Sequence, residues 1–368
     1  MKYSCPVVGT HASWLALNPI HGCPFSCKYC LMSGIGNTAR KPVVLCSPKE
    51  AVKQLIDYNS YIPTIPLCLF SSTDAFATPS NIEYAKKLIT ELLKHNIKNP
   101  IVLITKCHIP DDFIEFIDHV EKEGIQVVFL LSYSGLDSTI ERGVNHQKIR
   151  ENFIRLKAKN KKVIHYWRPF IPQNSSDEKI NDVLNFVKKY ACASIAIGLK
   201  VQDNFADNLD FWPEIIKEKE RAINSEATWT KNAYEKIYNK KYSEYKVFRS
   251  TSCAIAYCLG IPDYNCYFDT EICKLNNCSN EQIEMCRKKH NKNSENLNNT
   301  IKEYLNKINK DLSYTIDEGK KEITFNGILS TTEIVSLKYL TGYNILGERD
   351  QNDYYWNTGH YEGGNFII

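Results

Sequence analysis

Short apolar runs alternate with amphipathic segments through the first two hundred residues, and this alternation constrains the fold more than any other feature of the chain. Each run is bounded by polar or turn residues, as expected for buried β-strands. The runs are Leu15–Leu17, Leu67–Phe70, Ile101–Ile104, Val127–Leu131, Val163–Trp167 and Ile195–Leu199. Apolar residues with helical spacing lie between several of them, over residues 84–93, 113–120 and 180–187. Because right-handed β-α crossovers produce a parallel sheet, we expect an α/β fold whose six units form a partial TIM barrel.

Three cysteines, Cys23, Cys27 and Cys30, follow the first predicted strand with the spacing C-x3-C-x2-C. A [4Fe-4S] cluster usually takes four thiolates, so a loop with three leaves one iron open to a ligand from outside the protein. Sites in β/α barrels lie at the carboxyl ends of the strands, and the loop follows such an end. The alternatives are a zinc site or buried free thiols, but zinc knuckles usually pair two such units, and only His21 lies nearby.

The order of the motifs resembles that of a known group of enzymes. Residues 22–30 read Gly-Cys-Pro-Phe-Ser-Cys-Lys-Tyr-Cys, the signature of radical S-adenosylmethionine (SAM) enzymes. The later motifs resemble proteins related to spore photoproduct lyase and are Phe70–Asp74, Ile104–Lys106, Ser132–Asp137 with Glu141–Arg142, and Arg168–Pro172. This resemblance covers residues 10–200. It implies a radical SAM partial barrel, a [4Fe-4S] cluster on the three cysteines with SAM at its open iron, and reductive cleavage of SAM to a 5'-deoxyadenosyl radical.

Polar residues at the strand ends are the candidates for binding the cofactor. The resemblance places Tyr29 beside the adenine of SAM, and Thr73 and Asp74 in a signature near SAM. The hydroxyl and carboxylate groups that offer partners for the amino group and ribose of SAM are those of Ser71, Ser72, Thr73 and Asp74. The alternative for this segment is a turn that caps the following helix. Ser132 and Arg168 end later strands, where a cation is suited to a carboxylate or phosphate. Tyr133, Glu141 and His165 stand near strand ends and are the catalytic candidates.

One departure from the lyases concerns the substrate. The lyases use a cysteine as hydrogen donor, which we expect near residues 71–74, where this chain has serine. A serine O–H bond is too strong to replace a thiol as donor to a carbon radical. We therefore expect a substrate other than a thymine dimer.

A second group of cysteines lies far along the chain. Its members are Cys253, Cys258, Cys266, Cys273, Cys278 and Cys286. Their spacing is too wide for a zinc ribbon with paired C-x2-C knuckles. We expect an auxiliary [4Fe-4S] cluster on Cys253, Cys273, Cys278 and Cys286. Cys266 and then Cys258 are second choices as ligands, because Cys258 lies in an apolar run. Structural zinc is the alternative.

The cysteine content and the N-terminus bear on the compartment. The chain has 14 cysteines and no apolar stretch typical of a secretory signal or a membrane span. We therefore expect a cytoplasmic protein that does not associate with membranes, with cysteines used for metal or redox chemistry rather than disulfides. The net charge of +4 is too small to indicate nucleic-acid binding by itself.

The sequence divides into four regions. Residues 1–200 form the predicted barrel, 201–249 a charged helical connection, 250–290 the cysteine-rich metal segment, and 291–368 a polar linker with a small α+β unit. In the last region, Ser330 and Glu333 form a capping box before a predicted helix. Gly342 is expected to end that helix.

These features predict a radical SAM enzyme of lyase or oxidoreductase type. The leading hypothesis is hydrogen abstraction from a nucleic acid or nucleotide, which follows from the lyase resemblance. The alternative is oxidation or cyclisation of a peptide or small metabolite with the auxiliary cluster as electron acceptor. A non-catalytic metal-binding scaffold is the third hypothesis. The expected partner is a reductant such as flavodoxin or ferredoxin.

Overall fold

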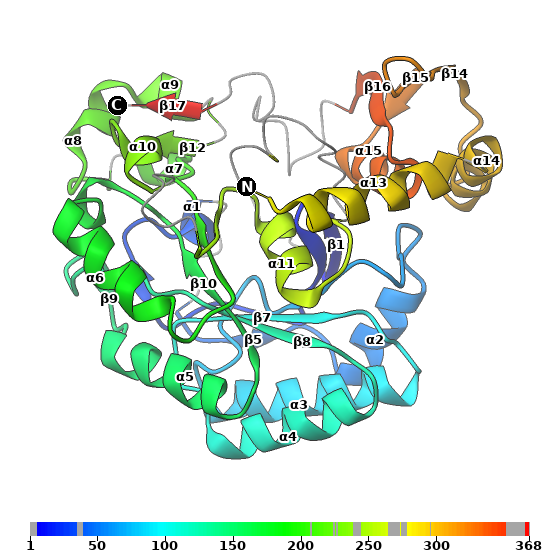
Figure 1. Cartoon of the computed structure of the whole chain (residues 1–368). Helices are drawn as coiled ribbons and strands as arrows, with labels where there is room; N and C mark the ends of the chain where they lie inside the picture. Colours follow the sequence, from blue (N-terminus) through cyan, green and yellow to red (C-terminus); the bar gives the residue numbers. More distant parts are fainter. Residues whose placement is uncertain are drawn as a thin grey trace.

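The computed structural model describes residues 6–34, 40–206, 208–223, 225, 227–237, 244–263, 273, 278–294, 296–350 and 365–367. Figure 1 shows a central sheet with helices on both sides and a small terminal unit at the upper right. No helix in the described residues is both long and apolar enough to cross a membrane.

An eight-stranded sheet forms the centre of the molecule, in the order β1-β2-β6-β7-β8-β10-β11-β13. Its strands are β1 (Val8–His11), β2 (Trp14–Leu17), β6 (Leu67–Leu69), β7 (Ile101–Thr105), β8 (Val127–Leu131), β10 (Lys162–Trp167), β11 (Ala193–Ala196) and β13 (Val247–Phe248). All neighbours pair in parallel except β1 and β2. The six predicted strands and the α/β fold are confirmed, although β11 begins two residues earlier than predicted. Within the described residues the sheet is open, with β1 and β13 at its edges.

Four helices pack on one face of the sheet, which we call the outer face. They are α3 (Pro79–Lys94), α4 (Asp111–Lys122), α5 (His146–Ala158) and α6 (Asp177–Val187). Alternate residues of a strand face opposite sides, and Leu103, Phe129 and Val163 pack beneath these helices. Thr78 and Ser176 cap α3 and α6 through their hydroxyl groups. Helix α4 begins at Asp111, and Pro110 occupies its cap position. A further helix, α2 (Pro48–Ile56), packs beside α3.

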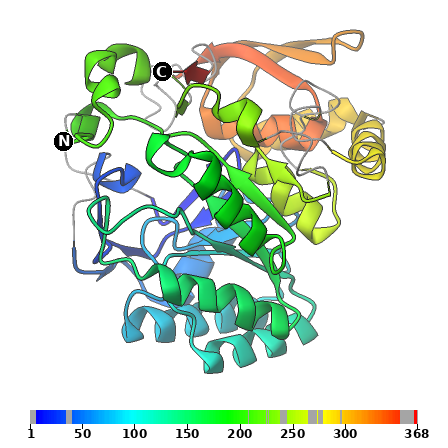
Figure 2. The same ribbon diagram turned by 60° about the vertical axis from the view of Figure 1, so that its left-hand side comes forward.

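The helix α11 (Thr251–Leu259) packs on the inner face of the sheet, against β8, β10, β11 and β13. Figure 2 shows this helix from the side. Ile255 and Leu259 join Val102, Val128 and Ile164 in one buried cluster, and burying each of these side chains contributes about 2 kcal/mol. The helix begins directly after the carboxyl end of β13, with Ser250 as its N-cap, and ends at Gly260 in a left-handed conformation. The first turn of α11 therefore lies at the carboxyl edge of the sheet.

Short elements follow β11 and cover the cysteine loop. They are α7 (Asp203–Ala206), α8 (Pro213–Lys217), α9 (Lys219–Ile223), β12 (Ala227–Trp229) and α10 (Ala233–Ile237). Leu209, Trp212 and Ile215 pack with Tyr29 and Ile140 in a separate buried cluster. Residues beyond the predicted barrel therefore close one side of the expected site. Strand β12 pairs with β17 (Asn365–Ile367).

The C-terminal residues form an α+β unit with its own core. It contains α13 (Asn280–Ser294), α14 (Leu297–Lys307), β14 (Ser313–Asp317), β15 (Glu322–Leu329), α15 (Thr331–Thr341) and β16 (Asn344–Arg349). The predicted capping box of Ser330 and Glu333 and the left-handed Gly342 are both present. The unit contacts the loop before β6, where Tyr304 and Ser60 hydroxyls lie 2.8 Å apart and Tyr339 and Thr64 hydroxyls 2.7 Å apart.

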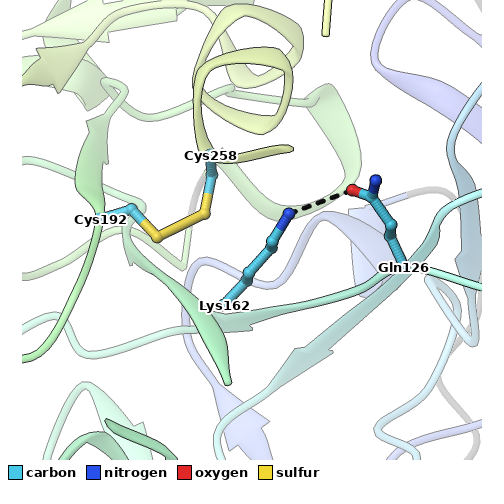
Figure 3. The surroundings of a disulfide bond; sticks show 4 residues. All are labelled: Gln126, Lys162, Cys192 and Cys258. Carbon is cyan, nitrogen blue, oxygen red and sulfur yellow. Dashed lines mark hydrogen bonds between the residues drawn. A yellow bond between two sulfur atoms is a disulfide. The ribbon is translucent and has the colours of Figure 1, made fainter. Parts of the chain in front are cut away.

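A disulfide joins Cys192, just before β11, to Cys258 in α11, with their Cα atoms 5.8 Å apart (Figure 3). Beside it, Lys162 donates a hydrogen bond to Gln126 over 3.1 Å. The expectation that no cysteine forms a disulfide is therefore wrong, and so is Cys258 as a second choice for a metal ligand. Cys192 and Cys258 are 66 residues apart in the sequence. Their pairing therefore depends on how α11 packs rather than on local spacing.

Candidate active site

The three-cysteine loop lies at the carboxyl edge of the sheet, between β3 (Ile20–His21) and α1 (Leu31–Gly34). Cys27 lies in the short strand β4 (Ser26–Cys27), and the Cys30 amide donates to the Cys27 carbonyl over 3.2 Å. Burial raises the pKa of Cys23 and of Cys27 to about 12. The neighbouring Cys30 thiol contributes to both of these increases in pKa. The three thiols therefore lie close to one another.

Glu141 connects four segments around this loop. It lies in β9 (Glu141–Arg142), which pairs with β4 so that Glu141 stands opposite Cys27. Its fully buried carboxylate accepts hydrogen bonds from the Tyr29 and Ser134 hydroxyls. Its other neighbours are the Lys106 ammonium at 2.6 Å and the His146 imidazole at 3.0 Å. Burial raises the pKa of Glu141, and His146 opposes that rise.

Lys106 supplies the positive charge of the site. It follows β7, and its ammonium lies 5.7 Å from the centre of the Tyr29 ring. Burial lowers the pKa of Lys106, whereas the Cys27 thiolate beside it opposes that change. Conversely, the Lys106 charge favours ionisation of Cys27. A buried cation beside a thiol stabilises its thiolate, which is the form that binds iron.

Asp74 joins the carboxyl ends of two neighbouring strands. Its buried carboxylate accepts from the Thr105 hydroxyl at 2.9 Å and from the backbone amides of Lys106 at 2.8 Å and Phe76 at 2.9 Å. Burial raises the pKa of Asp74, and these donors oppose the rise. Asp74 therefore holds the loop after β6 against the end of β7 and so fixes the backbone that carries Lys106.

The hydroxyl residues before Asp74 contact the start of the cysteine loop. Ser71 donates to the side-chain carbonyl of Asn18 over 3.0 Å, and the Ser72 amide donates to the same oxygen over 3.3 Å. Thr73 donates to the carbonyl of Gly22, the residue before Cys23. The alternative, a turn that caps the following helix, is also present, because Thr78 at the end of this segment caps α3. In the structure, residues 71–74 thus anchor the cysteine loop to the sheet.

Ser132 and Arg168 lie at the ends of β8 and β10. Ser132 is buried, and its amide donates to the Thr105 carbonyl over 2.9 Å. Arg168 is partly buried, and its guanidinium donates to the Tyr166 hydroxyl over 2.9 Å. Both residues therefore lie at the same carboxyl edge as the cysteine loop.

Tyr133 and His165 pack under α5 on the outer face. The His165 ring contacts Tyr133 and Phe153, and its nitrogens lie 2.7 Å from the Tyr133 carbonyl and 2.8 Å from the Ser194 hydroxyl. Burial lowers the pKa of His165 to about 4. The Tyr133 hydroxyl accepts from Arg150 over 3.0 Å. Of the three catalytic candidates, the structure therefore places only Glu141 beside the cysteine loop.

Several residues of the site were missed as site residues in the sequence. Lys106 and Ser134 lie in motifs at strand ends, and His146 lies in no motif. The three meet at Glu141 from separate segments, so their common partner is not visible in the sequence. Cys107 lies beside Asp74, to which its thiol hydrogen-bonds, and close to Cys23. Lys28, within the loop, pairs with Asp210 over 2.7 Å and links the loop to the residues that cover it. The position of Lys28 between Cys27 and Cys30 was the one feature of the sequence that could have marked it as a site residue.

Four of the C-terminal cysteines form a second group of thiols. Burial raises the pKa of Cys253, and Asp263, Cys273 and Cys286 are near enough to raise it further. A hydrogen bond with Cys273 and burial raise the pKa of Cys278. These four are the cysteines predicted as auxiliary ligands, and the structure brings them together. The second choice, Cys266, lies outside the described residues.

Neither thiol group converges on a single point. Among the residues that the structure describes, no three Cys, His, Asp or Glu side chains are arranged as ligands of one metal ion. In an iron-sulfur cluster each cysteine ligates a different iron, so its thiolates surround the cluster rather than meet at one atom. The donors of the first group, three thiols beside a buried cation, fit the chemistry of such a cluster.

One family model and several solved structures match this chain. The model of the Radical SAM superfamily matches residues 17–187. No curated protein sequence matches the chain. Solved structures that match include spore photoproduct lyase complexed with dinucleoside spore photoproduct, at 11% identity and a TM-score of 0.43 over 58% of this chain and 63% of that chain. SuiB of Streptococcus suis bound to S-adenosylmethionine matches at 14% identity and a TM-score of 0.39, over 56% of this chain and 48% of that chain.

A radical SAM methyltransferase from Sphaerobacter thermophilus also matches, at 13% identity and a TM-score of 0.38, over 58% of this chain and 66% of that chain. The chain thus spans less than two thirds of the length of each of these proteins. The family match begins at the last residue of β2, ends with α6, and includes the loop of Cys23, Cys27 and Cys30. Residues 17–187, just under half of the chain, are therefore a radical SAM domain.

Proposed function

We propose that this protein is a radical SAM enzyme that cleaves SAM reductively and abstracts a hydrogen atom from an organic substrate. The observation that carries the proposal is the group of Cys23, Cys27 and Cys30, held at the carboxyl edge of the sheet beside Lys106 and Glu141. When bound there, a [4Fe-4S] cluster supplies the electron that divides SAM into methionine and a 5'-deoxyadenosyl radical. The electron comes from a small reductant such as flavodoxin or ferredoxin.

The residues of the loop would hold the cluster. Three thiolates would ligate three irons, which would leave the fourth iron for SAM. Lys106 favours the thiolate form of Cys27, and the fourth nearby thiol, Cys107, is engaged by Asp74. Thr73 binds the Gly22 carbonyl and Ser71 binds the Asn18 side chain, both of which precede Cys23. These hydrogen bonds keep the loop in the conformation that presents the thiols.

The same edge offers partners for SAM. Lys106 is suited to the carboxylate of SAM, because a buried ammonium and a carboxylate form a strong charge-assisted hydrogen bond. Ser132, Arg168 and the Tyr29 ring are the further candidates for contacts with the cofactor. Glu141 serves as a positioning residue, since it holds Lys106 and Tyr29 in fixed orientations.

Residues outside the family match exclude water from the loop. Leu209 and Trp212 are almost fully buried and pack with Tyr29 and Ile140, and the Lys28–Asp210 ion pair fixes this segment to the loop. A radical site needs such protection because side reactions with solvent and solutes compete with hydrogen abstraction.

The proposed substrate class is a nucleic acid or nucleotide, which the motif resemblance over residues 10–200 supports. A second candidate is oxidation or cyclisation of a peptide or small metabolite. The group of Cys253, Cys273, Cys278 and Cys286 favours this candidate, because an auxiliary cluster there can accept the electron that a substrate radical loses on oxidation.

The test is formation of 5'-deoxyadenosine by the anaerobically reconstituted protein with dithionite and SAM. We expect product from the wild type and from the control C46A, whose thiol belongs to neither group, and none from C27A. A wild type that binds iron at Cys23, Cys27 and Cys30 but forms no 5'-deoxyadenosine would overturn the proposal. Stimulation by oligonucleotides rather than by peptides supports the first substrate class, and the reverse result supports the second.

A further inference from the structure

We propose that Cys253, Cys273, Cys278 and Cys286 hold a second [4Fe-4S] cluster closed by four thiolates, and that Gln282 tunes it through an N–H···S hydrogen bond to Cys286. The existence of this site is independent of SAM cleavage. Its use as an electron acceptor rests on the proposed function.

The first argument is where the four thiols lie. Cys253 is in the first turn of α11, which starts at the carboxyl edge of the sheet after β13. Cys253 and Cys278 both contact the buried cluster on the inner face of the sheet. The cysteine loop occupies the same carboxyl edge, because it follows the parallel strand β2. The fold thus brings two groups of thiols to one edge from segments more than two hundred residues apart.

The second argument is that the thiols face one another across separate segments. The Cys278 amide donates to the Cys273 carbonyl over 3.2 Å, and their side chains are also hydrogen-bonded. Cys286 lies in α13, near both Cys253 and Cys278. Four neighbouring thiols match the usual ligand set of a closed cubane cluster. Irons replace the protons of such thiols on binding, which removes the repulsion between thiolates.

The third argument is the hydrogen bonding of one sulfur. The Asp263 amide donates to the Cys286 sulfur over 3.3 Å, and the Gln282 side-chain amide donates to the same sulfur over 3.6 Å. Gln282 is 8% exposed, and it also donates to the Ile261 carbonyl over 3.0 Å. Hydrogen bonds to ligand sulfurs stabilise the more negative, reduced state of a cluster and so raise its reduction potential. The position of Gln282 one helical turn before Cys286 therefore suits it to tune the cluster.

The asymmetry between the two thiol groups supports different roles. The first group has three cysteines and a neighbouring cation, and so leaves an iron for SAM. The second group has four cysteines with Asp263 as the neighbouring charge. A cluster with four protein ligands has no open iron, so it exchanges electrons without binding substrate directly. This division of roles follows from the donor sets alone.

The experiment measures iron, sulfide and zinc in the full chain after anaerobic reconstitution. We expect about eight irons in the wild type and in C46A, and about four in C23A/C27A/C30A and in C273S/C286S. Retention of four irons and an electron paramagnetic resonance signal in the first variant supports the second site. Loss of all iron from C23A/C27A/C30A, or one zinc per chain in place of the second cluster, would overturn it. A wild type with eight irons and no 5'-deoxyadenosine formation would overturn the proposed function but leave this site in place.

A second variant keeps all the thiols, in case C273S/C286S does not fold. We expect Gln282→Leu to retain about eight irons and to shift the reduction potential of the C-terminal cluster to a more negative value. The matched control is Gln147→Leu, on the exposed surface of α5, which should leave that potential unchanged. An unchanged potential in Gln282→Leu would overturn the assignment of Gln282 as the tuning residue.

Discussion

The Lys106 ammonium lies 2.6 Å from the Glu141 carboxylate, and Glu141 stands directly opposite Cys27 in the β4–β9 pair. The side chains are 17% and 0% exposed, so water screens this pair little. The pair connects the end of β7 with the cysteine loop. A cation fixed in this way is available to the cofactor without a large loss of side-chain entropy.

Replacing Lys106 by Met should weaken SAM binding at least tenfold, because the cation that is proposed to bind the SAM carboxylate is lost. Equilibrium binding of SAM to the reconstituted protein measures this. Lys98→Met, which removes an exposed lysine that contacts a distant backbone carbonyl, serves as the control. Equal SAM affinity in K106M and the wild type would contradict the role of Lys106.

The Lys106–Glu141 pair should also show energetic coupling. We expect a double-mutant cycle with K106M and E141Q to give a coupling free energy of about 2 kcal/mol, because both groups are buried and close. Urea unfolding of the apoprotein supplies the four free energies. Additive effects within about 0.5 kcal/mol would show that the two groups do not interact.

Asp74 should matter for stability as well as for the cofactor. Asp74→Ala leaves the Thr105 hydroxyl and two backbone amides without their acceptor, so the free energy of unfolding should fall by about 3 kcal/mol. The control is Asp57→Ala, an exposed partner of Lys53, with an expected change below about 0.5 kcal/mol. Similar changes in the two variants, measured by urea unfolding, would contradict the structural role of Asp74.

His165 should make the protein less stable in acid. Its pKa is about 4 in the folded protein and near 6.5 when unfolded, so the unfolded chain binds more protons between these values. Stability is therefore complete above the unfolded pKa and decreases as the pH falls toward 4, by up to about 3 kcal/mol. Unfolding free energies measured from pH 7 to pH 4 should show this slope reduced in His165→Gln. The same slope in both proteins would exclude His165 as its source.

The Cys192–Cys258 disulfide should stabilise the packing of α11. Cys258→Ser should lower the free energy of unfolding of the oxidised apoprotein by about 3 kcal/mol, because the disulfide closes a long loop. Dithiothreitol should lower the melting temperature of the wild type but not that of C258S. An identical response of the two proteins to the reductant would show that the pair is not bonded in solution.

The strands were predictable where the chain buries continuous apolar runs, as in Val127–Leu131, whose bounds match β8. Strand β13 was missed because it has two residues, and only its pairing with β11 identifies it. Strand β1 was missed because it alternates buried and half-buried residues and contains a glycine and a histidine. Short edge strands depend on their neighbours more than on their own composition.

The cysteine loop was predictable because its three ligands are close in sequence. Glu141 was recognised only as a residue near a strand end, since its partners Tyr29, Lys106 and His146 come from separate segments. The four thiols of the second group were chosen from spacing and polarity, and the structure brings these four together. Cys258 differs because its partner, Cys192, is remote in the sequence and nothing near either residue indicates the pairing.

The most direct test of the central claim is electron paramagnetic resonance of the reduced cluster with and without SAM, in C273S/C286S so that only the cluster of Cys23, Cys27 and Cys30 contributes. A cluster with an open iron changes its signal when SAM binds to that iron, and isotope-labelled SAM should show hyperfine coupling to the cluster. We predict both changes. An identical spectrum with and without saturating SAM, and no coupling to the label, would contradict the claim that the three cysteines hold a SAM-binding cluster.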